Sequence, residues 1–226
     1  MNVSDLIALP FEWGSAIRGK RFFHPVGVLA EGSIERLAPA SEGLPIRSAD
    51  VLARVSKATG TPGPLPDFIG LAIRVPPSRE TDKPWDVLLV SAGSGMLARA
   101  VALRPATSWN GQTLTTLMPL HYKGSHWWLR ARTAGDIDGV GLSLDNVRKR
   151  LEQGPIQVAL DQACGRRDFA PLARLTLTSA VDAERRGDVA FDPVINTAPG
   201  LHLSPGWLAD LRARAYHRSR EGRDAD

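Results

Sequence analysis

The chain of 226 residues carries a net charge of +4 and 43% hydrophobic residues, which is enough apolar material for one globular domain with its own core. No apolar run reaches the roughly 20 residues that a membrane helix requires, and the first residues lack the basic region of a secretion signal. With one cysteine, Cys164, no internal disulfide can form. We therefore expect a cytoplasmic protein without a membrane partner.

The first half of the chain is predicted to consist mainly of short strands. Residues 1–20 are expected to form a helical or irregular lead-in, broken by Pro10 and Gly14. A strand pair or one bent strand follows over 26–37. Segments rich in Val, Ile and Leu, bounded by turn residues, predict further strands, and a stiff Gly-Pro connection joins two of them. These strands cover 51–56, 69–76 and 86–91, with the connection at 60–66.

The second half is predicted to contain three strands and two helices. Strands are predicted at 126–132, 155–160 and 171–178. One helix is predicted at 143–152, with Ser143 as its N-cap, and another at 204–220, where apolar residues recur at helical spacing. The last residues, 221–226, are expected to fray. The pattern predicts a single domain over 1–226, an all-β or α+β barrel, but it does not say what the barrel holds.

The excess of positive charge lies near the C-terminus, where five arginines fall between positions 212 and 223. A basic segment of this kind can contact nucleic acid or an acidic surface. No nucleic-acid-binding motif and no basic aromatic cluster accompany it. We interpret most of these arginines as solvated residues of a helix surface and expect no nucleic-acid partner.

Three separated segments carry short motifs that combine arginine with histidine, serine or tyrosine. The first is Arg-Phe-Phe-His-Pro-Val-Gly at 21–27, followed by Gly32 and Glu35. The second begins Arg-Val-Ser at 54–56, and continues through Asp67-Phe-Ile-Gly-Leu-Ala-Ile-Arg74 to Trp85-Asp86. The third, at 206–216, places Arg212 four residues before Tyr216, so on a helix both side chains lie on one face.

In this chain order the segments resemble the haem catalases, and residues 168–177 and 191–193 resemble the small bacterial catalase-like proteins. The resemblance covers roughly 21–91 and 168–220. It implies a minimal catalase-like antiparallel β-barrel with flanking helices, in the α+β class, that binds haem b. It also implies these roles: His24 as the distal histidine, Ser56 as the hydroxyl that orients it, Arg21 and Arg54 as propionate partners, and Tyr216 as the axial iron ligand, with Arg212 stabilising its phenolate.

The chain departs from the catalases in two ways that bear on activity. The distal asparagine of true catalases has no counterpart in 91–97, and Asn110 lies in a different, turn-like context. The chain is also much shorter, which implies a more open pocket. We therefore expect an enzyme with peroxidase or hydroperoxide-processing activity, acting on peroxide or a small organic hydroperoxide with an unidentified electron donor. A barrel without wrapping segments can pair as a homodimer to cover its apolar flank.

Two other functions stay open at this point. The first is a haem-free binding or interaction protein built on a degenerate catalase barrel. The second is a metal-dependent hydrolase such as a phosphodiesterase, for which His121, His126, Asp136 and Asp138 are the candidate ligands. The two histidines lie five residues apart, a spacing that does not place them on one helical face.

Overall fold

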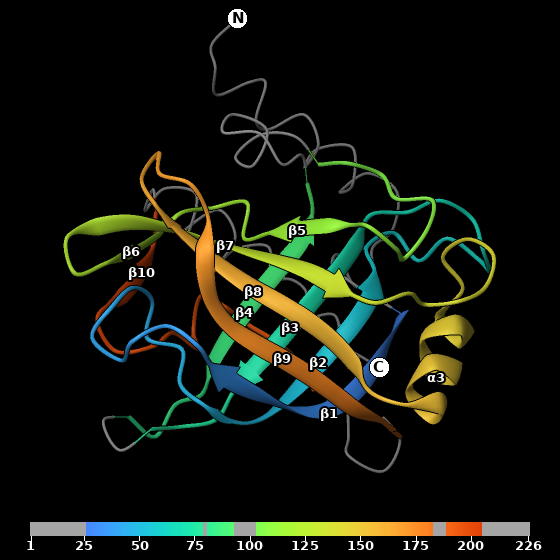
Figure 1. The fold of residues 1–226 in the computed structure, drawn as a ribbon, viewed down its shortest axis with the longest axis horizontal. Coiled ribbons are helices and arrows are strands. Elements are labelled where there is room, and N and C mark those ends of the chain that lie inside the picture. Colours follow the sequence, from blue (N-terminus) through green and yellow to red (C-terminus); the bar gives the residue numbers. More distant parts are fainter. Residues whose placement is uncertain (1–25, 79–80, 93–102, 183–188, 205–226) are drawn as a thin grey trace, which may run out of the picture.

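The computed structural model describes residues 26–78, 81–92, 103–182 and 189–204 (Figure 1). Ten strands of this part belong to one antiparallel sheet, and one helix accompanies them. The strands are β1 (Val26–Arg36), β2 (Ala49–Lys57), β3 (Ile69–Val75), β4 (Trp85–Ser91), β5 (Thr113–Thr115), β6 (Leu120–Tyr122), β7 (Ser125–Ala134), β8 (Ile156–Cys164), β9 (Ala170–Val181) and β10 (Leu201–Leu203); the helix is α3 (Leu144–Gln153).

Eight of the strands close into a barrel. The order is β7-β5-β4-β3-β2-β1-β9-β8, and the ring is completed because β8 also pairs with β7. The two remaining strands extend the wall outward: β6 pairs with β7, and β10 pairs with β6. In Figure 1 this β10–β6 extension lies at the opposite side of the molecule from α3. The predicted antiparallel barrel is thus confirmed.

Alternation along each strand separates the inside of the barrel from its outer face. On β2, Val51, Ala53 and Val55 pack with the main core, whereas the intervening side chains point the other way. On β3 every odd residue from Ile69 to Val75 joins the same core. Large aliphatic side chains from all the main strands fill the interior, as expected for a barrel of eight strands. The outer face is therefore where polar and charged residues of these strands gather.

The first strand is one continuous, bent strand rather than a pair. Its register with β9 shifts between Glu31 and Gly32, which marks a β-bulge. A Cβ atom on Gly32 would lie 2.1 Å from the carbonyl oxygen of Thr176, so only glycine permits this approach of β1 to β9. The bulge bends β1 and so helps to close the barrel.

The helix was predicted correctly, and for the reason given. Ser143 caps α3 by accepting a hydrogen bond from the Asp145 amide, and Val147 and Leu151 are buried against the barrel. Each predicted strand is confirmed to within a few residues at its ends, whereas the three-residue strands β5, β6 and β10 were missed. The lead-in at 1–20, most of the helix predicted at 204–220 and the tail at 221–226 lie outside the described residues.

The described part of the chain is therefore mostly β with one short helix, and further flanking helices stay a prediction. Within these residues no helix is long and apolar enough to span a bilayer.

Candidate functional site

Two of the six predicted site residues lie in the described part of the chain. Arg54 and Ser56 both stand on β2, two residues apart, and both face outward from the barrel. The structure thus brings them onto one surface. The other four, His24, Arg21, Arg212 and Tyr216, lie outside the described residues, and their roles stay predictions.

A glycine on the neighbouring strand lies against both of these side chains. Gly27 of β1 is the register partner of Ser56. A Cβ atom on Gly27 would lie 2.9 Å from Cγ of Arg54, from Cβ of Ser56 and from the carbonyl oxygen of Val55. The absence of a side chain therefore lets the β1 backbone approach the two predicted site residues closely.

Ser56 is buried, with 1% of its surface exposed. Its hydroxyl donates a hydrogen bond to the carbonyl oxygen of Gly70 on β3, at 3.4 Å. At this length the bond to Gly70 is a weak one. Its position against the backbone of Gly27 is fixed by the strand register.

Arg54 is held by a segment that is distant in sequence. One of its guanidinium nitrogens donates to the carbonyl oxygen of Val189 at 2.9 Å. The guanidinium carbon also lies 5.4 Å from the ring centroid of Phe191, and Arg74 lies over the same ring at 5.1 Å. Phe191 is thus attracted by two cations at the outer face.

The ring of Phe191 belongs to a small apolar cluster on the outer face of the barrel. Leu29, Ala72 and Phe191 are its buried members, and Leu52, Leu88, Val181 and Val189 pack around them. The cluster is separate from the core inside the barrel. Residues 189–191 therefore cover part of the outer face on which Arg54 and Ser56 lie.

Asp86 fastens the following residues to the barrel wall. Its carboxylate receives two hydrogen bonds of 2.7 Å from the guanidinium of Arg74, one to each oxygen. It also accepts from the Asp192 amide at 2.8 Å and from the Asn196 side-chain amide at 2.7 Å. The carboxylate is fully buried, so these donors replace the water that it loses. The pKa of Arg74 is raised, chiefly by its hydrogen bonds to Asp86.

The loop between β2 and β3 is organised by a second buried pair of charges. Burial alone would raise the pKa of Asp67, but hydrogen bonds from the backbone and side chains of Thr59 and Thr61 outweigh it and lower that pKa. Burial lowers the pKa of Lys57, and the charge of Asp67 partly offsets this. The Lys57 ammonium donates to the carbonyl oxygens of Gly63 and Leu65. These contacts shape the loop beside the end of β2 that carries Ser56.

The candidate metal ligands of the hydrolase hypothesis do not gather in one place. His121 and His126 are register partners across β6 and β7, with ring centroids 5.3 Å apart. Asp136 and Asp138 follow the opposite end of β7, a strand of ten residues, roughly 30 Å away. Across the described ranges, no group of three or more His, Cys, Asp or Glu side chains is arranged to hold a metal ion as it stands.

A small hollow lies beside β4, where the strand diverges from β5. Apolar side chains line it, among them Trp85, Leu120 and Leu201, together with Thr116. The Thr116 hydroxyl is buried and has no hydrogen-bond partner among the described residues. The free volume of the hollow is about 20 Å³, which accommodates about one water molecule beside this hydroxyl.

Sequence reasoning assigned no role to Arg74, Asp86 or Phe191, although all three lie in segments that it singled out. Arg74 and Asp86 are register partners in the β3–β4 hairpin. Their outward positions on two consecutive predicted strands were a signal that they meet. Nothing in the sequence indicated that Phe191 would lie over Arg54, because 137 residues separate the two.

No family model matches this chain, and no curated protein matches it either. The resemblance to the catalases therefore rests on the three sequence segments, and the structure adds an eight-stranded antiparallel barrel.

Proposed function

We propose that this chain is a haem-binding, catalase-like protein with peroxidase or hydroperoxide-processing activity. The observation that carries the proposal is the pairing of Ser56 with Gly27, next to Arg54, on the outer face of the barrel. Two residues that the resemblance assigns to the haem site thus share one surface. The closed antiparallel barrel is the architecture that the resemblance implies.

The register of β1 and β2 supports a role for Ser56 toward His24. His24 precedes Gly27 by three residues, and three residues of chain span at most about 11 Å. This spacing permits a contact, and we propose that the Ser56 hydroxyl binds the His24 imidazole and selects its tautomer. The imidazole takes the proton from the peroxide and returns it to the departing oxygen.

Residues of this chain would hold the haem. When bound, a ferric haem would supply an electron-rich iron for the cleavage of a peroxide O–O bond. Tyr216 is the proposed ligand, and Arg212, four residues earlier, favours its phenolate form. Arg21 and Arg54 are the proposed partners of the propionates.

The substrate range follows from what the chain lacks. Without a distal asparagine, peroxide is positioned less well for disproportionation, so an organic electron donor is the expected reductant. We propose peroxide or a small organic hydroperoxide as the oxidising substrate. We propose cytoplasmic activity, and a homodimer that covers the apolar flank of the barrel.

The test begins with an absorption spectrum of the full chain expressed with a haem precursor. The chain contains two tyrosines, which offers a matched pair of variants, Tyr216→Phe and Tyr122→Phe. We expect a Soret band with high-spin ferric features that shifts or collapses in Tyr216→Phe and is unchanged in Tyr122→Phe. Peroxide turnover should fall at least about 100-fold in His24→Ala and stay near wild type in His202→Ala.

A specific observation favours the haem-free alternative as the second candidate. Arg54 is engaged by Val189 and Phe191, so residues 189–191 occupy part of the surface that the haem would share. The alternative is a haem-free binding or interaction protein built on the same barrel. Protein that stays free of haem after reconstitution would refute the enzyme and leave this binding function.

A further inference from the structure

Three of the five histidines of the chain lie in one row across the barrel extension. His121 of β6 is the register partner of His126 on β7, and on its other side of His202 on β10. Side chains directly opposite each other on antiparallel strands point to the same face of the sheet. The three imidazoles therefore share one face, with His121 in the middle.

The His121–His126 pair is the closer of the two. The turn between them is Lys123-Gly124, and both residues have positive φ, 49° and 73°, as in a two-residue type I′ hairpin. Tyr122 and Ser125 flank this turn as a hydrogen-bonded pair. The next pair away from the turn, His121 and His126, is therefore a non-hydrogen-bonded pair, the kind in which side chains lie closest. The imidazole centroids are accordingly 5.3 Å apart.

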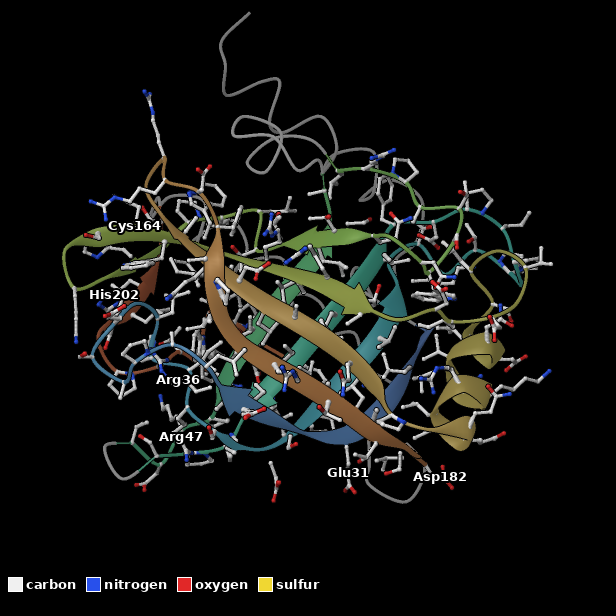
Figure 2. All side chains as sticks on the ribbon, viewed as in Figure 1. Glu31, Arg36, Arg47, Cys164, Asp182 and His202 are labelled. Carbon is white, nitrogen blue, oxygen red and sulfur yellow. The ribbon has the colours of Figure 1, made fainter. Side chains whose placement is uncertain are left out.

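His202 lies on the other side of His121 and is exposed to solvent, as is His126. Figure 2 shows it at the β10 side of the molecule, far from Glu31 and Asp182. Its register places its Cβ about 5 Å from that of His121. The two outer histidines are therefore about 10 Å apart at Cβ, and two imidazoles that meet at one ion span about that distance, since metal–nitrogen bonds are about 2 Å.

We propose that His121, His126 and His202 form a binding site for a divalent transition-metal ion such as Zn²⁺. Neutral imidazole is a preferred ligand of Zn²⁺, Ni²⁺ and Cu²⁺, and three histidines with a water in the fourth position complete a tetrahedral site. No role in the haem reaction uses these residues.

In the described residues these three side chains are not arranged around a common metal position, so binding requires a change of side-chain rotamers. Two of the three are exposed, and exposed side chains change rotamer freely. Nε2 of His126 lies 3.1 Å from Oγ of Ser204, a contact between exposed groups that rotation toward the ion breaks at little cost. His121 is half-buried and serves as the fixed ligand around which the other two close.

The consequence of binding is that β10 becomes fastened to the barrel. β10 is three residues long and pairs with β6, itself a strand of three residues. One ion coordinated by all three strands connects β10 to β7, with which it does not pair. A ligand that binds the folded state also raises its unfolding temperature.

The test is a calorimetric titration of the tag-free full chain with Zn²⁺ at about pH 7.5. We expect micromolar binding of one equivalent and no binding of Mg²⁺, which prefers oxygen ligands. His121→Ala, His126→Ala and His202→Ala should each weaken binding at least about tenfold, whereas Ser204→Ala, which keeps all three imidazoles, should stay within about threefold. Because His121 is half-buried, His121→Gln is measured beside His121→Ala, with circular dichroism to check folding.

A dissociation constant above about 1 mM for the wild type would overturn the proposal, since that is no tighter than chance surface histidines. An unchanged affinity in His202→Ala would equally overturn the three-ligand site. Zinc-dependent quenching or enhancement of tryptophan fluorescence gives an independent readout, because Trp127 and Trp128 follow His126 directly. The row lies on β10, β6 and β7, whereas Arg54 and Ser56 lie on β2, so failure of either proposal leaves the other standing.

Discussion

Two buried carboxylates on different parts of the barrel wall bind arginine in quite different ways. Asp86 of β4 accepts hydrogen bonds from two guanidinium nitrogens of Arg74, and also from the Asp192 amide and the Asn196 side chain. Asp161 of β8 uses one oxygen to accept from Arg130 and Arg132 of the adjacent strand β7. The first therefore connects segments more than 100 residues apart, and the second connects neighbours.

The difference shows which side of the barrel depends on long-range contacts. Asp86 holds the segment whose Val189 and Phe191 cover Arg54, so the candidate haem face is completed by residues from the far end of the chain. The β7–β8 side is completed by its own strands: Arg132 stays half exposed, and Arg130 lies over Phe169 at 4.3 Å. A change at Asp86 should thus affect the candidate site, and a change at Asp161 should not.

The sharpest way to break this comparison is to remove each carboxylate in turn. We expect Asp86→Ala to lower the free energy of unfolding by about 3–5 kcal/mol, because it leaves Arg74 and the amides of the 192–196 turn without their buried acceptor. Urea denaturation measures the loss, and proteolysis near residue 189 tests whether the segment detaches.

Asp161→Ala is the matched control. Its arginines are 20% and 51% exposed, so water can solvate them once the carboxylate is gone, and we expect a loss of about 1–2 kcal/mol. Equal losses in the two variants would contradict the distinction between the two sides.

The junction between the two sides can be tested at the bulge. Gly32→Ala should lower the free energy of unfolding by about 2–3 kcal/mol, since a Cβ there meets the Thr176 carbonyl oxygen at 2.1 Å and neither backbone can yield easily. Gly27→Ala is the companion, and its nearest contacts, at 2.9 Å, are longer than the 2.1 Å contact at Gly32, so a smaller loss of about 1–2 kcal/mol is expected. Thermal denaturation of both variants is the measurement, and a larger effect for Gly27→Ala would show that the bulge is not the tighter contact.

The smallest change in the free energy of unfolding is expected for a third buried carboxylate, in the loop between β2 and β3. Asp67 is held by backbone and hydroxyl donors of Thr59 and Thr61, which lower its pKa below the ordinary 3.8. A lowered folded pKa means that its contribution to stability is present above about pH 4 and is lost as the pH falls through the folded value. Asp67→Asn should therefore be less stable than wild type by about 1–2 kcal/mol at neutral pH.

The measurement is the free energy of unfolding of both proteins from pH 7 downward. The difference between them should be constant well above the ordinary pKa of 3.8 and should shrink as the pH falls below it. A difference that does not change with pH would show that Asp67 acts through its shape and not through its charge.

Much of the fold could be predicted because it depends on local patterns. The strands at 69–75 and 85–91 follow from short apolar runs between turn residues, and α3 from a capping serine before a helical stripe. The three-residue strands β6 and β10 could not be found in this way, because so few residues show no periodicity. The hairpin turn Lys123-Gly124 was a signal for β6 that went unread.

The candidate site divides along the same line. The residues of Arg54-Val55-Ser56 alternate, and alternation alone places Arg54 and Ser56 on one face of a strand. Which strand lies beside them, and the fit of Gly27 against both, depend on the register of β1 and β2. The covering of Arg54 by Phe191 depends on the fixation of residues 192–196 by Asp86.

The sequence by itself thus determined which residues form strands, which face of each strand is apolar, and which residue types are available for chemistry. Only the tertiary structure decided that eight strands close into a barrel, that Asp86 binds residues 192–196, and that His202 stands beside His121. The physical reason is that periodicity reports on neighbours within about ten residues, whereas strand register and closure are set by packing between residues that are far apart in the chain.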